Sequence, residues 1–86
     1  LSTVMAVIDE VAFQRMDRRV ALLLLERARR QNPLRITHQE IAAELGSSRE
    51  VISRLLEDFV SEGSIRSGRG AVEVLDFDLL ESRSLV

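Results

Sequence analysis

The chain has 86 residues, enough for one small domain, and a net charge of −2, because 14 acidic residues oppose 12 basic ones. It has no cysteine, which excludes disulfide frameworks, thiolate metal sites and cysteine nucleophiles. No apolar run approaches the roughly 20 residues of a membrane span, and the N-terminus lacks a signal-peptide core. We therefore expect a cytoplasmic protein with no membrane partner.

The N-terminal segment carries a short heptad seam, with Asp9 and Glu10 on its other side. The residues at the a and d positions of this seam are Leu1, Val4, Ile8 and Val11. Two interpretations stay open: the end of a longer dimerisation helix, or an amphipathic helix that packs on its own domain. We assign residues 1–14 to the end of a dimerisation helix and hinge, and residues 15–86 to a separate domain.

A core helix is predicted from about Met16 to Arg30, because apolar residues recur there at helical spacing. The sequence does not show whether this helix continues the preceding segment. Pro33 ends it, since proline disfavours helical geometry at the residue before it and cannot donate a backbone hydrogen bond. Residues 34–36 are then a short extended piece.

Residues 37–62 predict two short helices joined by a tight turn. Thr37 and Glu40 stand at the spacing of a capping box, which starts the first helix. Gly46 permits the left-handed backbone that ends it. A second cap pattern at Ser47–Glu50 starts the next helix, which spans about residues 48–62.

This second helix has two unlike faces. The apolar face consists of Val51, Ile52, Leu55, Leu56, Phe59 and Val60. The opposite face consists of Arg49, Glu50, Ser53, Arg54 and Glu57. A helix with a buried face of its own thus presents a polar ridge outward.

A hairpin follows, because apolar and polar residues alternate on both sides of a glycine turn at Ser67–Gly70 and continue to Leu75. Asp76 or Asp78 can cap a last short helix that reaches Leu80, and we expect the remainder to be frayed. Two helices around a tight turn, followed by a hairpin, describe a winged helix-turn-helix. The predicted fold class is mainly α with a small β-hairpin wing.

The residues Ile36–Ala42 and Leu45–Leu56, with their run SSREVISRLL, resemble the C-terminal domain of the Crp/Fnr family of bacterial transcription regulators. The likeness extends over nearly the whole chain. It implies sequence-specific DNA binding, with the helix at about 48–62 as the recognition helix in the major groove.

The resemblance also implies which residues contact DNA. Base-reading positions of the family fall on Arg49, Glu50, Ser53 and Arg54, and at 100° per residue these span about 140° of arc, so they can face one groove. Arginine suits guanine O6 and N7, and Glu50 suits the cytosine amino group. Alternatively, Glu50 completes a capping box with Ser47. Phosphate contacts are expected from Thr37, His38, Gln39, Ser47, Ser48 and Arg69.

His38 has an open alternative, an exposed histidine with no role, because many family members carry arginine there. With one histidine and no cysteine, the chain offers little for a metal, so we expect no metal and no cofactor within it. An upstream sensor domain outside this chain would hold any effector.

By the same resemblance we expect a homodimer on a palindromic double-stranded DNA operator, with RNA polymerase as a possible partner through the Gln31–Leu34 loop. The alternative function is a winged helix used for protein association without DNA binding, which the acidic balance favours. An enzyme is not expected, because neither paired carboxylates in an apolar pocket nor a nucleophile with its base can be identified.

Overall fold

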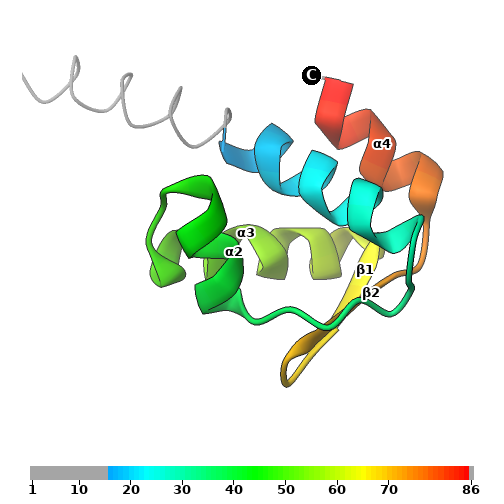
Figure 1. Cartoon of the computed structure of the whole chain (residues 1–86). Coiled ribbons are helices and arrows are strands. Elements are labelled where there is room, and N and C mark those ends of the chain that lie inside the picture. The colour runs from blue at the N-terminus through cyan, green and yellow to red at the C-terminus, as the bar shows by residue number, and fades with distance from the viewer. Residues whose placement is uncertain (1–15, 86) are drawn as a thin grey trace, which may run out of the picture.

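The computed structural model describes residues 16–85. In chain order these form a helix over residues 16–28, α2 (His38–Leu45), α3 (Arg49–Glu62), β1 (Ile65–Gly68), β2 (Ala71–Val74) and α4 (Phe77–Leu85). The helices pack together, and the β1–β2 hairpin projects beyond them as a wing (Figure 1). The fold is the predicted winged helix-turn-helix. The predicted dimerisation positions Leu1, Val4, Ile8 and Val11 lie outside the described residues.

The helix over residues 16–28 supplies one side of the core. As predicted, this helix buries Val20, Leu23, Leu24 and Ala28, and Met16 is partly buried against the core. The helix ends at residue 28, slightly earlier than the expected Arg30. The backbone tightens there, because the amide of Arg30 bonds to the carbonyl of Arg27, three residues back, at 3.1 Å.

The segment after this helix joins the wing, which the sequence did not predict. Leu34 and Val72 exchange two backbone hydrogen bonds of 2.9 Å, so the extended piece pairs with β2 as a single antiparallel bridge. The side chain of Asn32 continues the ladder: its amide donates to the carbonyl of Val74 and its oxygen accepts from the Val74 amide, both at 2.9 Å. A carboxamide carries one donor and one acceptor side by side, as a peptide group does.

The two helices of the helix-turn-helix start and stop largely where the sequence indicates. Thr37 and Glu40 form the capping box, and Gly46 ends α2 with a φ of 68°. The predicted start of the next helix is wrong by one residue. Its N-cap is Ser48, whose hydroxyl accepts from the Val51 amide at 3.2 Å, and not Ser47. The amide of Ser47 instead closes the end of α2 on the carbonyl of Ala42 at 2.8 Å.

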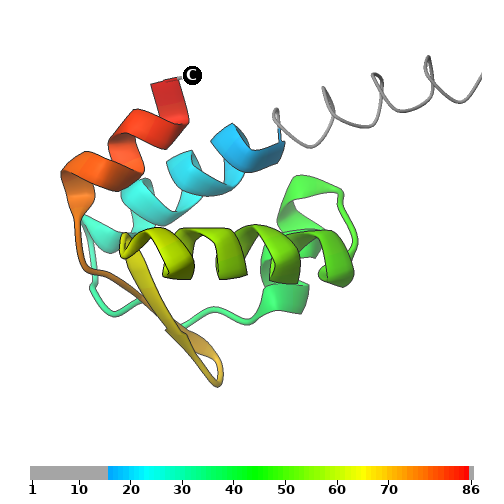
Figure 2. The same ribbon diagram turned by 180° about the vertical axis from the view of Figure 1, so that it is seen from behind.

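α3 crosses the middle of the domain (Figure 2), and its apolar face is buried. Ile52, Leu55, Leu56 and Phe59 are buried, as predicted. Val60 does not belong to this face, because it is 43% exposed. One residue beyond Phe59 the helix has turned by about 100°, which carries the side chain toward solvent.

The wing ends one residue earlier than predicted, and the last helix is longer than predicted. The strands pair from Ile65 with Val74 to Gly68 with Ala71. Leu75 lies beyond β2 and is 52% exposed. Asp76 is the residue that caps α4, since its carboxylate accepts from the Leu79 amide at 3.0 Å.

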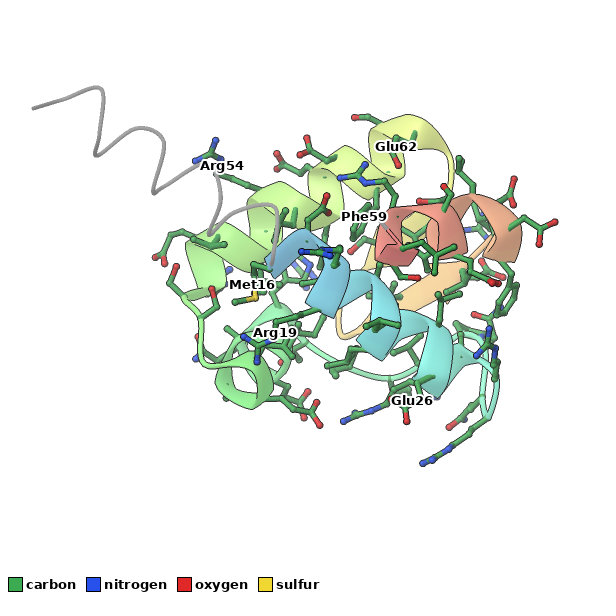
Figure 3. The ribbon with its side chains drawn as sticks, turned by 90° about the horizontal axis from the view of Figure 1, so that it is seen from above. Met16, Arg19, Glu26, Arg54, Phe59 and Glu62 are labelled. Atoms are coloured by element: carbon green, nitrogen blue, oxygen red, sulfur yellow. The ribbon has the colours of Figure 1, made fainter. Side chains whose placement is uncertain are left out.

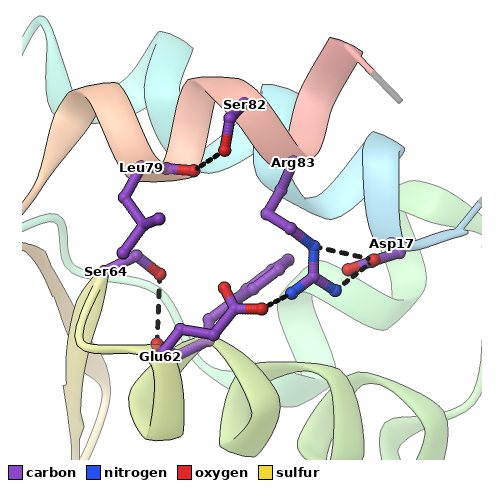
Figure 4. Close-up of polar contacts among 7 residues, drawn as sticks. Asp17, Glu62, Ser64, Leu79, Ser82 and Arg83 are labelled. Carbon is purple, nitrogen blue, oxygen red and sulfur yellow. Dashed lines mark hydrogen bonds and ion pairs between the residues drawn. The ribbon is translucent and has the colours of Figure 1, made fainter.

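The expected fraying after Leu80 is wrong, because α4 continues to Leu85. Arg83 explains this, as its guanidinium pairs with both Asp17 and Glu62 (Figure 4). The guanidinium carbon also lies 4.9 Å from the centre of the Phe59 ring. We call Arg83, Asp17 and Glu62 the Arg83 clamp. It ties α4 to the helix over residues 16–28 and to the C-terminal end of α3.

Candidate nucleic-acid interface

The outward face of α3 carries the four residues that the sequence assigned to base reading. Arg49, Glu50 and Arg54 are exposed, and Ser53 is half-buried. In Figure 3 the side chain of Arg54 extends away from the helix. The cap at Ser48 places Val51, and not Glu50, at the capping-box position, so the alternative role of Glu50 with Ser47 is wrong. We call Arg49, Glu50, Ser53 and Arg54 the polar ridge.

The start of α2, the start of α3 and the wing turn surround one hollow. Among its lining residues are Thr37, His38, Gln39, Arg49 and Arg69. The fold thus brings four of the predicted phosphate-contact residues beside one predicted base reader. Ser47 and Ser48 lie in the turn that links α2 to α3, with Ser48 exposed and Ser47 half-buried.

Two helix N-termini open at this surface. Amide groups in the first turn of a helix lack intrahelical partners, and the helix dipole places a partial positive charge there. The first turns of α2 and α3 begin at His38 and Arg49. Such ends favour phosphate oxygens. They supply positive potential that a net charge of −2 does not reveal.

The capping box fixes the start of α2 and lowers one pKa. The Thr37 amide donates to the Glu40 carboxylate at 2.9 Å, and the Thr37 hydroxyl accepts from the Glu40 amide at 3.0 Å. The backbone hydrogen bond from Thr37 is the largest cause that lowers the pKa of Glu40 below its ordinary value of 4.5, followed by the Thr37 side chain. The ionised form of Glu40 therefore stabilises the folded chain.

Replacement of Glu40 by glutamine tests this linkage. Because the folded pKa is lowered, the charge contribution is fully present above the ordinary value of 4.5 and is lost as the pH falls through the folded pKa. Glutamine keeps a cap hydrogen bond but no charge. We expect the Glu40→Gln variant to melt below the wild type at pH 7, and the gap to narrow as the pH falls below 4.5. Thermal unfolding followed by circular dichroism measures both, and a gap that is independent of pH would contradict the assignment.

His38 is half-buried, in contrast to the exposed histidine considered from the sequence. Its Nδ1 lies 2.8 Å from the hydroxyl of Ser53 on α3, and its Nε2 lies 3.4 Å from the hydroxyl of Ser67 on β1. A predicted phosphate contact thus bonds to a predicted base reader. Sequence reasoning had no signal for this contact, because the partners are 15 and 29 residues away.

Several other arginines pair with acidic side chains away from the polar ridge. Arg27 pairs with Glu44, and Arg66 pairs with Glu73 across the wing. Arg29 lies 3.8 Å from Glu81 on α4. The charges of Arg27 and Arg29 are therefore partly neutralised by acids from α2 and α4.

Neither a metal site nor a membrane-spanning helix is found within residues 16–85. No group of three or more histidine, aspartate or glutamate residues is placed there to hold a metal ion. Over the same described range, no helix is both long enough and apolar enough to cross a membrane.

The sequence and the fold both match known proteins. A family model described as the Crp-like helix-turn-helix domain matches residues 18–83. The transcriptional regulator SdrP of Thermus thermophilus is 37% identical in a match that covers 88% of this chain and 44% of that protein. The cyclic AMP receptor protein of the same organism is 43% identical over 76 residues, which cover 86% of this chain and 35% of that protein.

The likeness holds in three dimensions. The crystal structure of the Thermus thermophilus catabolite activator protein superposes with a TM-score of 0.85 at 37% identity, and the match covers 99% of this chain and 41% of that one. The chain spans less than half the length of the relatives it matches.

Proposed function

The chain belongs to the Crp-like helix-turn-helix family of transcription regulators, and from this premise we propose that it binds double-stranded DNA in a sequence-specific manner, as a regulator's output domain. The observation that carries the proposal is the polar ridge of α3, whose Arg49, Glu50 and Arg54 are exposed beside two helix N-termini and the wing. A helix with this outward face fits the width of the major groove.

Base reading is assigned to the N-terminal half of α3. Arg49 and Arg54 would each donate two hydrogen bonds to guanine O6 and N7, and Glu50 would accept from the amino group of cytosine. Glu57 and Asp58 are exposed farther along the helix. Since the N-terminal residues of a recognition helix approach the bases, these two acids would lie where they repel phosphates least.

Phosphate contacts are assigned to the helix starts and the wing. Thr37, Gln39, Ser47, Ser48 and Arg69 would hold the duplex in register through side-chain and backbone donors. His38 lies in the same group, with both ring nitrogens directed at serine hydroxyls. These contacts would supply most of the affinity, and they would make it depend on salt.

We further propose that two copies bind a palindromic operator, with one α3 in each of two successive major grooves about 34 Å apart. The heptad positions Leu1, Val4, Ile8 and Val11 would form part of the dimer contact. Any effector would bind a sensor domain outside this chain. RNA polymerase is a further candidate partner, through residues 31–34.

The salt dependence of binding tests the function. Duplexes that the wild-type chain recovers from a randomised pool are titrated by fluorescence anisotropy at two salt concentrations. A DNA-binding domain must lose affinity steeply as salt rises, because each phosphate contact releases a counterion. The alternative function is a protein-association module, which the excess of acidic over basic residues favours. For such a module, binding to duplex DNA would be absent or independent of salt.

Replacement of Arg49 by alanine tests the assigned ridge. We expect a loss of about 1–3 kcal/mol in binding to the selected duplex, with relaxed preference at one base pair. The matched control is Arg29→Ala, which removes the same charge from a residue beside Glu81 on α4. The control should keep the base preference of the wild type. Unchanged binding by Arg49→Ala would overturn the ridge as the reading surface.

A further inference from the structure

His38 lies where three elements meet. It is the first residue of α2, and its ring contacts α3 through Ser53 at 2.8 Å and β1 through Ser67 at 3.4 Å. The ring is half-buried between them. One side chain thus links both helices of the helix-turn-helix to the wing.

His38 lines two hollows whose other residues differ in charge. One hollow that it lines contains Arg49 from α3 and Arg69 from the wing turn. The other contains Glu57 and the apolar Val60, both from α3. His38 therefore lines both the basic hollow at the helix starts and a second hollow along α3.

The hydrogen-bonding chemistry of imidazole gives the two serines opposite roles. A neutral ring has one N–H donor and one bare acceptor nitrogen. In the tautomer with its proton on Nε2, the Ser53 hydroxyl donates to Nδ1 across the shorter of the two separations, 2.8 Å. The proton of the ring then lies on Nε2, directed at Ser67. Ser53 is left with lone pairs only, whereas Ser67 keeps its hydroxyl proton.

We propose that His38 is a positioning residue of the DNA interface, which fixes Ser53 as a hydrogen-bond acceptor toward the bases and Ser67 as a donor toward the backbone. This inference rests on the proposed function. An acceptor at Ser53 selects the exocyclic amino group of adenine or cytosine in the major groove. A serine without this constraint rotates and offers either a donor or an acceptor, so it discriminates less.

Two substitutions of similar size distinguish the hydrogen bond that His38 forms with Ser53 from the one that it forms with Ser67. Asparagine places its amide atoms two bonds from Cβ, as Nδ1 is, and so can still accept from Ser53. Glutamine places them three bonds from Cβ, as Nε2 is, and so can reach only Ser67. His38→Asn should therefore keep the base preference that Ser53 gives, and His38→Gln should lose it. Both are polar and uncharged, so each is the control for the other.

The test uses duplexes recovered by the wild-type chain from a randomised pool, each with one base pair replaced in turn. Ser53→Ala, His38→Ala and His38→Gln should each reduce discrimination at the same base pair by about tenfold, the size of one good base contact. The double variant His38→Ala with Ser53→Ala should lose no more than either single variant, because both remove one interaction. His38→Asn should match the wild type.

Three results would overturn the inference. Additive effects of the two alanine variants would show that His38 and Ser53 act independently. Uniform weakening on every duplex, with base preference kept, would make His38 a direct phosphate contact. Loss of preference in His38→Asn but not in His38→Gln would reverse the assigned bonds. A wild-type chain without salt-dependent duplex binding would instead contradict the proposed function. Thermal unfolding of each variant confirms that it is folded.

Discussion

Replacement of Phe59 by alanine is expected to destabilise the domain by about 3–5 kcal/mol, the usual cost of truncating a buried aromatic ring. Phe59 is fully buried in α3 and is the largest of the fully buried side chains. Its ring also lies 4.9 Å from the guanidinium carbon of Arg83, so the variant loses that contact as well. Small domains have only about 5–15 kcal/mol of stability in total, so this one change should bring the chain close to unfolding.

The neighbouring residue is the matched control for this prediction. Val60→Ala removes an apolar side chain from the same helix at a position that is 43% exposed. Exposed substitutions of this kind usually change stability by less than about 0.5 kcal/mol. Urea unfolding of both variants gives the two free energies. A similar cost at both positions would show that the core is not centred on this face of α3.

Replacement of Arg83 by alanine is expected to cost about 3 kcal/mol, because it leaves a poorly hydrated carboxylate without its partner. The side chains of Asp17 and Arg83 are only 14% and 24% exposed. The Arg83 Nε–H donates to Asp17 Oδ2 at 3.2 Å, while Asp17 Oδ1 is buried with no hydrogen-bond partner among the described residues. Much of the expected loss therefore reflects the stranded charge of Asp17.

A double variant separates the stranded charge from lost packing. Asp17→Asn with Arg83→Met removes both charges and keeps an unbranched apolar chain near Phe59, so it should recover much of the loss. Arg83→Lys should recover less, because a single ammonium cannot bridge Asp17 and Glu62 as the planar guanidinium does. Arg83→Met alone keeps the packing but leaves Asp17 charged, so equal stability of Arg83→Met and the double variant in urea unfolding would show that the clamp contributes through packing alone.

The clamp also bears on the proposed function. Glu62 is the last residue of α3, and Asp17 lies at the start of the described helix that leads into the domain. Arg83 joins the two across the domain, as Figure 4 shows. The orientation of the proposed recognition helix relative to the N-terminal side of the domain thus depends on a residue in α4.

The sequence by itself determined the features that depend on neighbours a few residues apart. The capping box of Thr37 and Glu40, the glycine stop of α2 at Gly46, and the apolar face from Ile52 to Phe59 are confirmed. Each acts within about one or two helical turns, so spacing alone reveals it. The winged helix-turn-helix follows from the order of these elements. The roles of the polar ridge in base reading stay predictions.

Only the tertiary structure decided the contacts between distant segments. Ser53 meets His38 across 15 residues, Val74 meets Asn32 across 42, and Arg83 meets Asp17 across 66. Each of these polar side chains has ordinary local surroundings, and its partner is set by how the helices and the wing pack around the core. Local periodicity does not encode such pairings, because the free energy that selects them comes from burial and hydrogen bonding in the assembled domain.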